Sequence, residues 1–338
     1  MTDTSPLIEA QEKFQHALTP NIGPQEILAI EDCLGRVTAT DVNAPMDSPP
    51  YPRSIVEGFV VHSGETQSAS EASPVSFSII GSTKPGDPSC PTPNSGQGIE
   101  VATGSIVPAG DYAIVRMWEA KRTADTFSIE RPFPPGFFIE AQGCDIQKGS
   151  KLVAAGHRLT AKDIGNLASL GICEVAVVSK PRVAIFASGN EVIPHNQSFR
   201  AGAIFDCNSP MLAAAVSDKG CVAVKMGIQD DNFENFVIAV KQALASNDMI
   251  LIAGGTAVDG RDFISDLIKE VGELIIDGVP MRSGRPLIMG KGNDKPIVCV
   301  AGHPPEALRG FEMFGDIAIN RMLGVEAPLP GDPNGEKS

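Results

Sequence analysis

Residues 248–262 constrain the fold of this chain more than any other part of the sequence. They begin with a short apolar run, residues 249–253, that has the length and composition of a buried strand. The run stops at Gly254 and Gly255, and apolar residues return at helical spacing after Asp262. A strand, a glycine loop and a helix in this order are typical of a parallel α/β sheet, whose ligands bind at the carboxyl ends of the strands.

The glycine loop has two interpretations at this point. Gly254 and Gly255 let the backbone approach a phosphate or a sugar closely, and the N-terminus of the following helix favours an anion. Asp262 would then bind a cation or orient a polar group. In the alternative interpretation, the segment is a tight turn and Asp262 only caps the helix.

Length and composition exclude several classes of protein. With 338 residues the chain can form two or three domains, and its net charge of −14 argues against a nucleic-acid partner. No apolar run approaches the ~20 residues of a membrane span, and the first thirty residues do not resemble a signal peptide, so we expect a cytoplasmic protein without a membrane partner. The seven cysteines include no Cys-x-x-Cys pair, which argues against a zinc site or a disulfide scaffold.

The first half of the chain contains two kinds of sequence pattern. Residues 5–19 have helical spacing, and residues 24–44 are predicted to form a second short helix and an extended strand. Between residues 53 and 140, short β-like runs alternate with Gly, Pro and Ser clusters, which is typical of a small barrel-like β domain. A helix and a strand follow in residues 145–180. We therefore predict an inserted β domain, 49–142, within a discontinuous elongated α+β domain, 1–48 and 143–180.

From residue 181 on, predicted strands alternate with predicted helices, which implies a mostly parallel sheet. The predicted strands are 183–187, 222–228, 249–253, 273–279, 287–290 and 297–301, and the predicted helices are 209–219, 232–246, 262–271 and 305–323. We assign residues 181–324 to this α/β domain and 325–338 to a tail. The predicted fold class is therefore α/β and β multidomain.

Several polar groups follow predicted strands of this sheet, and in a parallel sheet such loops gather on one edge and form one cleft. The segments are Gly189-Asn190-Glu191, Asp206-Cys207-Asn208, Gly254 to Asp262, Ser283-Gly284-Arg285-Pro286 and Gly302-His303-Pro304. The carboxylates Glu191, Asp206 and Asp262 could hold Mg²⁺ together with substrate phosphates. Arg282 and Arg285 could hold phosphate.

Each of these residues also has a structural interpretation. Glu191 could be a solvated carboxylate, Asp206 and Asn208 could only cap a helix, and His303 could be a turn residue. The sequence contains no P-loop, no Gly-x-Gly-x-x-Gly and no evident catalytic triad. Covalent catalysis and dinucleotide binding are therefore not supported.

An ordered set of segments from about residue 5 to 324 resembles the molybdopterin molybdenumtransferase family, which includes the E domain of gephyrin. The matching segments are Ser54-Ile55-Val56-Glu57-Gly58-Phe59, Glu100-Val101-Ala102-Thr103-Gly104, Gly143-Cys144-Asp145-Ile146, Leu167-Ala168-Ser169-Leu170-Gly171-Ile172, residues 181–192 and Ile204-Phe205-Asp206-Cys207-Asn208. The resemblance implies insertion of molybdate into adenylylated molybdopterin with Mg²⁺ and release of AMP, by a homodimer that works beside other cofactor-synthesis proteins. It implies a molybdopterin-binding domain at about 182–324 and a β domain that contributes Thr103 to the cleft.

On this resemblance we assign catalytic roles to Asp262, Glu191 and Asp206, with Asp262 and Asp206 as metal ligands. The substrate-binding candidates are Glu57, Thr103, Asn208, Gly254, Gly255, Arg282, Ser283, Gly284, Arg285 and Pro286.

The chain departs from the family pattern at several of these positions. Glu57 stands for an aspartate, Ala257 for a serine, Asp259 for a glycine, and Arg285 for a lysine, which keeps the charge but changes its geometry. The family's C-terminal β domain is not expected, because about fourteen residues follow Gly324. These departures motivate an alternative, a non-catalytic diverged paralogue that binds or carries molybdopterin or the cofactor. A nucleotide hydrolase on the same sheet is a third hypothesis.

Overall fold

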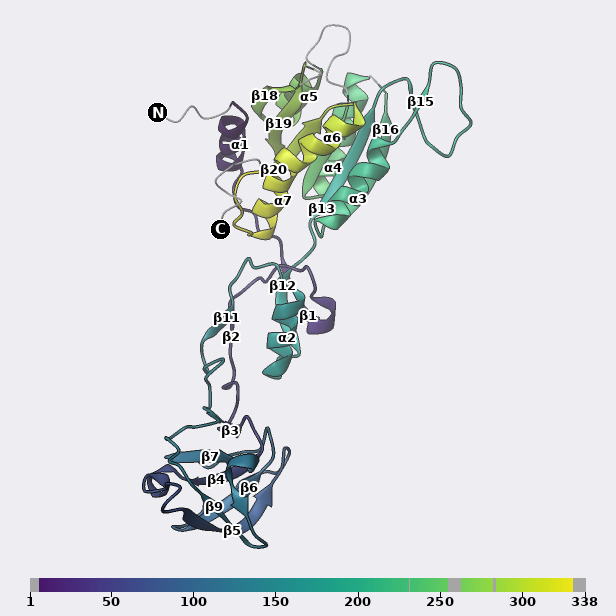
Figure 1. Ribbon diagram of the computed structural model, residues 1–338. Coiled ribbons are helices and arrows are strands. Elements are labelled where there is room, and N and C mark those ends of the chain that lie inside the picture. The colour runs from purple at the N-terminus through teal and green to yellow at the C-terminus, as the bar shows by residue number, and fades with distance from the viewer. Residues whose placement is uncertain (1–5, 231, 255–262, 282–283, 331–338) are drawn as a thin grey trace. The chain divides into compact units, whose positions relative to one another are not determined.

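The computed structural model describes residues 6–230, 232–254, 263–281 and 284–330 (Figure 1). The chain divides into two compact units, one formed by residues 1–41, 154–164 and 174–338 and the other by residues 42–153 and 165–173. No described helix is long and apolar enough to cross a membrane.

The first unit is built on a six-stranded sheet in the order β16-β13-β17-β20-β19-β18. The first four of these strands are parallel, and β19 and β18 continue the sheet as an antiparallel hairpin. The strands are β13 (Arg182–Ser188), β16 (Val222–Gln229), β17 (Met249–Ala253), β18 (Glu273–Met281), β19 (Gly284–Gly292) and β20 (Lys295–Val300). The predicted mostly parallel sheet is therefore confirmed.

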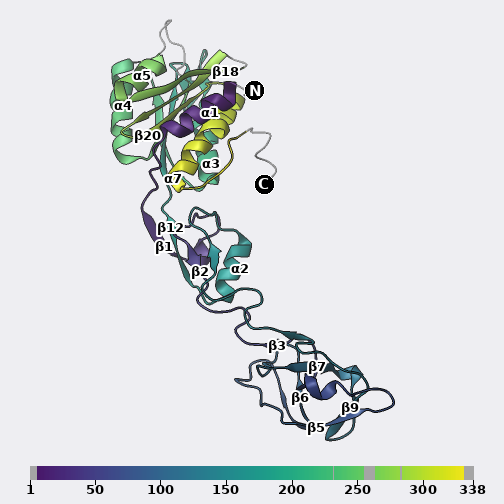
Figure 2. The same cartoon turned by 90° about the vertical axis from the view of Figure 1, so that its left-hand side faces the viewer.

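Helices cover both faces of this sheet (Figure 2). The helices are α1 (Pro6–Ala17), α3 (Asn208–Asp218), α4 (Phe233–Ser246), α5 (Phe263–Val271), α6 (Pro304–Gly310) and α7 (Asp316–Leu323), with a π-helical turn, Phe311–Gly315, between the last two. Successive side chains of a strand point to opposite faces, so Val183 and Ile185 of β13 pack with α1, α3 and α7, whereas Ala184 and Phe186 pack with α4 and α5. Burial on both faces explains why these strands are continuous apolar runs in the sequence.

An antiparallel pair of β1 (Gln25–Ala29) and β12 (Glu174–Val178) also belongs to the first unit. The helix predicted within residues 24–44 is wrong, because Gln25–Ala29 is a strand and only Ile30–Asp32 forms a 3-10 turn. The partner of β1 lies about 150 residues further along the chain, and a local pattern does not contain that pairing.

The second unit contains a curled six-stranded sheet in the order β7-β4-β6-β5-β9-β8 (Figure 1). Its strands are β4 (Gly58–His62), β5 (Val75–Thr83), β6 (Gln97–Val101), β7 (Tyr112–Arg116), β8 (Lys121–Arg122) and β9 (Thr126–Ile129). Its core is aromatic, and the ring of Phe127 stacks on Phe59 and Phe77 at centroid distances of 4.1 and 5.4 Å. This sheet confirms the predicted small β domain as part of the fold class.

Short antiparallel pairs precede and follow that sheet in the chain. They are β2 (Val42–Asn43) with β11 (Lys151–Val153) and β3 (Arg53–Ser54) with β10 (Ile139–Glu140). The helix α2 (Ala161–Ser169) follows β11. The residue boundaries that we predict for the three domains stay a prediction.

Candidate functional site

The carboxyl ends of three parallel strands meet at one level of the first unit's sheet. The register pairs Ala187 of β13 with Ala253 of β17, and Ala253 with Val300 of β20. The backbone N–H of Gly254 donates a 3.1 Å hydrogen bond to the carbonyl oxygen of Val300. The loops after β13, β17 and β20 therefore start side by side, as predicted for ligand-binding loops of a parallel sheet.

Gly254 permits a close approach of these loops. Its φ is +92°, and a Cβ at this position would lie 3.0 Å from the carbonyl oxygen of Ser188 and 3.8 Å from Cα of Gly302. A side chain would be strained by the left-handed backbone and would press on the β13 backbone. The glycine keeps the edge open to a ligand and allows the three loops to converge.

The first turn of α3 lies at the same edge. The carboxylate of Asp206 accepts a 3.0 Å hydrogen bond from the N–H of Ser209, and Nδ2 of Asn208 donates a 2.7 Å hydrogen bond to the carbonyl oxygen of Gly302. Asp206 therefore satisfies one of the free N–H groups of the helix, as a capping residue does. Asn208 instead ties the start of the helix to the loop after β20.

Glu191 is linked to Asp206 through a short parallel pair, β14 (Val192–Ile193) and β15 (Ile204–Phe205). The carbonyl of Glu191 accepts from Ile204 N–H at 2.9 Å, and the carbonyl of Ile193 accepts from Asp206 N–H at 2.8 Å. The Glu191 carboxylate folds back over Gly189, where a Cβ would lie 2.8 Å from Oε2. The structure thus pairs the two segments that carry these predicted carboxylates.

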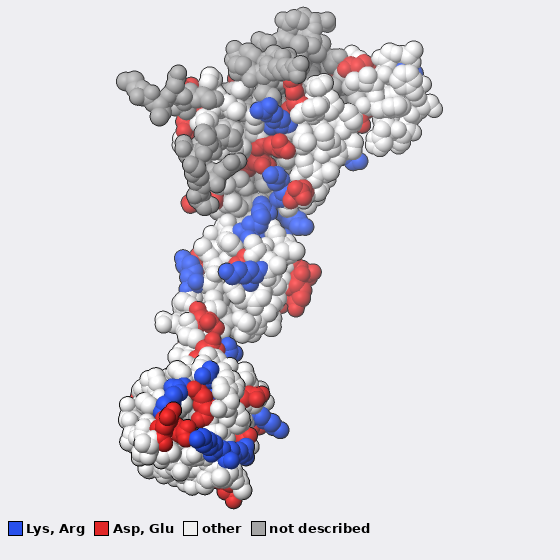
Figure 3. All heavy atoms as spheres, in the orientation of Figure 1, with Lys and Arg blue, Asp and Glu red and all other residues white. Residues whose placement is uncertain are grey.

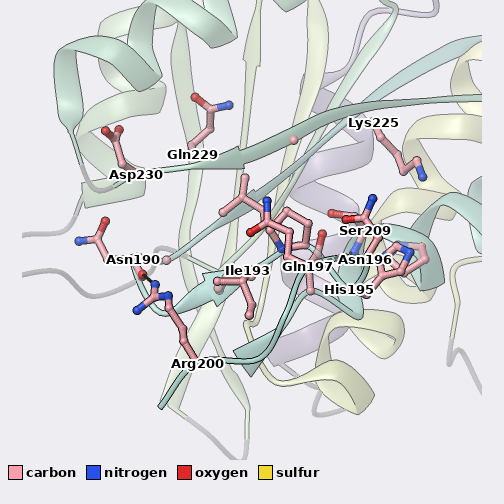
Figure 4. Close-up of a pocket in the computed structure, with 17 residues that line it drawn as sticks. Asn190, Ile193, His195, Asn196, Gln197, Arg200, Ser209, Lys225, Gln229 and Asp230 are labelled. Carbon is pink, nitrogen blue, oxygen red and sulfur yellow. Dashed lines mark hydrogen bonds between the residues drawn. The ribbon is translucent and has the colours of Figure 1, made fainter. Parts of the chain in front are cut away.

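A pocket of about 780 Å³ opens beside this edge (Figure 4). Its lining includes Gly189, Asp206 and Ser209, together with residues from β16 and from the segment 192–200. Lys225 and Ser209 lie at one end of the pocket, whereas Arg200 and Asp230 lie at the other. Such a volume lies within the range of small-molecule sites.

Sequence reasoning missed three charged residues of this pocket, Arg200, Lys225 and Asp230. Asp230 directly follows β16, so the rule that found the other loops could have found it. Lys225 lies inside a strand and Arg200 lies in a long loop, and neither position carried a signal. Nη2 of Arg200 donates to the carbonyl oxygen of Asn190 at 3.3 Å, which holds the guanidinium beside the loop after β13.

Several buried polar atoms at this edge have no hydrogen-bond partner within the described part of the chain. They are Ser188 Oγ, Asn208 Oδ1 and Ser209 Oγ. Buried polar atoms are hydrogen-bonded in the great majority of cases, so these three mark a place where a polar ligand can supply the missing partners.

In the second unit, Glu57 and Thr103 lie at one end of the curled sheet. Glu57 directly precedes β4 and Thr103 follows β6, and these strands pair with Gly58 opposite Val101. The carbonyl oxygen of Ser54 accepts from Gly104 N–H at 2.7 Å, which joins the two segments. Both side chains are exposed, as residues that contact a substrate must be.

The structure describes only some of the other predicted site residues. Gly255, Asp262, Arg282, Ser283 and the side chain of Arg285 lie outside the part of the chain that the structure describes. The turn predicted for Gly284-Arg285-Pro286 is wrong, because β19 begins at Gly284, which pairs with Met281. Pairing in an antiparallel hairpin extends the strand beyond its apolar residues. Pro286 is buried in that strand.

Candidate metal ligands at the sheet edge are the carboxylates of Asp206 and Glu191. These are hard oxygen donors of the kind that Mg²⁺ prefers, and one or two such groups suffice when phosphates supply the rest. Among the described residues, the one cluster of three potential ligands is Glu140, Cys144 and Asp145 in the second unit. There the guanidinium of Arg53 pairs with Glu140, and this pairing raises the pKa of Arg53.

The two halves of the chain match two family models. Residues 5–171 match the MoeA N-terminal region, domains I and II, and residues 184–321 match a probable molybdopterin binding domain. A molybdopterin biosynthesis MoeA protein from Pyrococcus horikoshii has 32% sequence identity and a TM-score of 0.82, over 95% of this chain and 81% of that one. The chain belongs to the MoeA family. The resemblance inferred from the sequence is confirmed.

Curated relatives of this MoeA-family chain agree with that assignment. Molybdopterin molybdenumtransferase from Staphylococcus epidermidis is 28% identical over 94% of this chain and 75% of its own length. The protein of the same name from Staphylococcus aureus is 28% identical over 91% of this chain and 74% of its own length. A second structure of the Pyrococcus horikoshii protein superposes with a TM-score of 0.81 at 26% identity, over 96% of this chain and 80% of that one.

Proposed function

We propose that this protein is a molybdopterin molybdenumtransferase that inserts molybdate into adenylylated molybdopterin and releases AMP. Membership in the MoeA family places it in molybdenum cofactor biosynthesis. The observation that carries the proposal is the convergence of Gly254, Asp206, Asn208 and Gly302 at one sheet edge, beside a pocket of about 780 Å³.

The pocket offers groups for each part of such a substrate. Arg200 and Lys225 supply positive charge for phosphates, and the side-chain amides of Asn196 and Gln197 can pair with ring edges. The unpaired hydroxyl of Ser209 can donate to a phosphate oxygen. The substrate is an anion, and the AMP that leaves is also an anion. Fixed cations therefore lower the free energy of the transition state, in which negative charge develops on the leaving phosphate.

The proposed role of the carboxylates is to hold a metal ion in a fixed position beside the substrate. Asp206 and Glu191, with Asp262, would hold Mg²⁺, which would supply positive charge that neutralises the phosphates of the substrate. Asp206 is kept in place by its bond to Ser209 N–H and Glu191 by the β14–β15 pair. Holding the reacting groups together is sufficient for such a transfer, so no covalent bond to the protein is required.

Finer parts of the proposal rest on the family pattern. Glu57 and Thr103 of the second unit would bind substrate, and Gly255, Arg282, Ser283, Gly284, Arg285 and Pro286 of the first would bind its phosphates. The protein would act in the cytoplasm as a homodimer beside other cofactor-synthesis proteins.

Complementation tests the activity. A strain that lacks the transferase would be supplied with the wild-type chain, with Asp206→Asn or with Glu191→Gln, at low and at high molybdate. We expect the wild-type chain to restore a molybdenum enzyme and both variants to restore less. Glu270→Gln is the matched control, because Glu270 is exposed on α5 and pairs with Lys241. Failure of the folded wild-type chain at both molybdate levels would exclude the transferase assignment.

The alternative function is that of a non-catalytic carrier of molybdopterin. Ala257, Asp259 and Glu57 motivate it, because they remove a hydroxyl, add negative charge to the glycine loop and lengthen a carboxylate. Calorimetry separates the two functions. Binding of molybdopterin without release of AMP after addition of molybdate would favour the carrier, and absence of binding to any pterin nucleotide would exclude both.

A further inference from the structure

A second cavity, of about 350 Å³, lies at the opposite edge of the parallel sheet. Arg182, Asp248 and Lys295, which line it, stand at the starts of β13, β17 and β20. The remaining walls come from residues 18–24, from residues 179–181 and from α7. The parallel strands begin here and end at the candidate substrate site, so the two cavities lie at opposite edges of one sheet.

The cavity is rich in positive charge although the chain carries a net charge of −14. Its lining contains four basic side chains, Lys180, Arg182, Lys295 and Arg321, and two acidic ones, Asp248 and Asp294. On the face seen in Figure 3, lysine and arginine side chains gather below the lower ends of α3 and α7, where β13 begins. A basic cavity in an acidic protein attracts anions locally.

Both carboxylates of the cavity already have partners. Oδ2 of Asp248 accepts a 2.8 Å hydrogen bond from the backbone N–H of Arg182. Oδ1 of Asp294 faces Nζ of Lys291 at 3.8 Å. Neither of these contacts is an ion pair with a basic side chain that lines the cavity.

The four basic groups differ in how many of their donors are bonded to protein atoms. Lys295 Nζ donates to the carbonyl oxygen of Leu244 at 2.7 Å, and Arg182 Nε donates to that of Ser246 at 3.3 Å. Among residues with described placement, Lys180 is exposed and makes neither a hydrogen bond nor an ion pair. Nε of Arg321 is buried without a partner there, and its Nη2 reaches only the carbonyl oxygen of Leu18, at 3.5 Å.

Apart from Thr19, Asn21 and Ser179, the uncharged part of the lining is apolar. Leu18, Ile22, Pro181, Pro296 and Met322 contribute it, and the volume lies at the small end of the range for organic ligands. A guanidinium with free N–H groups and an ammonium that line the same cavity supply the donors and the positive charge that a phosphate requires. The apolar wall adds a surface for the body of the molecule that carries this phosphate.

We propose that this cavity binds a small phosphate monoester with an apolar body, whose phosphate is held by Lys180 and Arg321. The site is separate from the proposed substrate site and does not depend on the transferase assignment. The ligand touches residues 18–24, which connect α1 to β1, and residues 179–182, which connect β12 to β13 of the sheet. Its binding therefore holds these two connections together.

Titration calorimetry on the full chain tests the site with phenyl phosphate, inorganic phosphate and phenol as probes. We expect saturable 1:1 binding of phenyl phosphate, weaker binding of inorganic phosphate and no binding of phenol. Lys180→Gln and Arg321→Gln should each weaken phenyl phosphate binding about tenfold or more, as expected when a charge-assisted hydrogen bond is lost. Lys241→Gln is the matched control and should bind like the wild type, because Lys241 is an exposed lysine of α4 outside the cavity.

Hydrogen exchange locates the binding independently of these variants. Phenyl phosphate should slow exchange in residues 18–24 and 179–182 of the wild-type chain, and much less in Lys180→Gln. Because Lys180 is exposed, Lys180→Gln should fold like the wild type, and its result stands even when Arg321→Gln is unstable. Absence of saturable binding at millimolar concentration, unchanged affinity in Lys180→Gln, or protection confined to the pocket beside Lys225 would overturn the proposal.

Discussion

The side chain of Asn208, the first residue of α3, donates a 2.7 Å hydrogen bond to the carbonyl oxygen of Gly302, in the loop after β20. The two residues are 94 positions apart in the chain. Their bond joins the helix that carries Asp206 and Ser209 at its start to the loop that packs against Gly254. The carboxyl edge of the sheet is thus held together by specific contacts between its loops.

Removal of this bond should destabilise the first unit. In Asn208→Ala the carbonyl of Gly302 loses its donor, and we expect the free energy of unfolding to fall by about 1 kcal/mol. Urea denaturation followed by circular dichroism measures the change. Asn196→Ala, in the exposed segment that also lines the pocket, is the control and should leave the midpoint unchanged. Equal midpoints for Asn208→Ala and the wild type would contradict a structural role of the bond.

The two glycines at the sheet edge should differ in their tolerance of a side chain. Gly254→Ala places a Cβ 3.0 Å from the Ser188 carbonyl oxygen at a φ of +92°, so we expect a loss of about 1–3 kcal/mol of stability. In Gly302→Ala the Cβ would meet Cα of Gly254 at 3.6 Å, an ordinary contact, and the loss should be small. Thermal denaturation of both variants checks this order, and a larger loss for Gly302→Ala would refute the packing described here.

Asp163 should make the stability of the first unit depend on acid pH. Burial raises the pKa of this carboxyl, but hydrogen bonds from Thr160 and His157 outweigh it and lower the pKa from 3.8 to about 2. Because the pKa is lower in the folded chain, the ionised carboxylate stabilises the fold above pH 3.8. This contribution is lost as the pH falls through 3.8 towards 2.

The variant Asp163→Asn isolates this effect. At neutral pH it should be about 1 kcal/mol less stable than the wild type, since it loses the charged cap at the start of α2. The difference should shrink between pH 4 and pH 2, as measured by urea denaturation across this range. Asp266→Asn, at an exposed pair with Lys269, serves as the control. A difference that stays constant down to pH 2 would show that Asp163 does not titrate as proposed.

The cysteines should fall into two classes of reactivity. Cys144, Cys173 and Cys207 are exposed, whereas Cys33, Cys221 and Cys299 are buried. Burial raises the pKa of Cys221 to about 12 and also raises that of Cys299, so neither thiolate forms near neutral pH. Titration with a thiol reagent at pH 8 should label the exposed cysteines first and the buried ones only after unfolding. Rapid labelling of Cys299 in the native protein would contradict its position in the core.

Labelling of Cys207 also reports on the site. This exposed thiol lies between Asp206 and Asn208, so a bound pterin nucleotide should slow its modification. Cys173, in the second unit, provides the internal control and should react at an unchanged rate. Equal protection of both thiols, or of neither, would argue against ligand binding at the carboxyl edge.

The sequence predicted the elements of the α/β unit well because their signals are local. Met249–Ala253 is a strand over the whole predicted range, since a run buried on both faces is apolar throughout. In contrast, β1 forms because the distant strand β12 pairs with it, and the first residues of β19 are in a strand because β18, its hairpin partner, pairs with them. A local pattern of about ten residues contains no information on a partner strand about 150 residues away.

In the candidate site, too, the residues with a local signal were predicted from the sequence, and those that depend on distant contacts were not. The rule that polar residues follow parallel strands predicted Glu191, Asp206 and Gly254 at one edge. The rule gave no information on Lys225, which lies within an edge strand and lines the pocket with its side chain. The sequence offered helix capping as an interpretation of both Asp206 and Asn208; Asp206 does cap α3, but the bond from Asn208 to Gly302 depends on how two distant segments meet.

Release of AMP from adenylylated molybdopterin tests the central claim most directly. The purified wild-type chain would be mixed with this substrate and Mg²⁺, and AMP would be quantified with and without molybdate. The proposed function predicts AMP release that requires molybdate and falls sharply in Asp206→Asn but not in Glu270→Gln. Binding of the substrate by the folded protein without any molybdate-dependent release of AMP would contradict it.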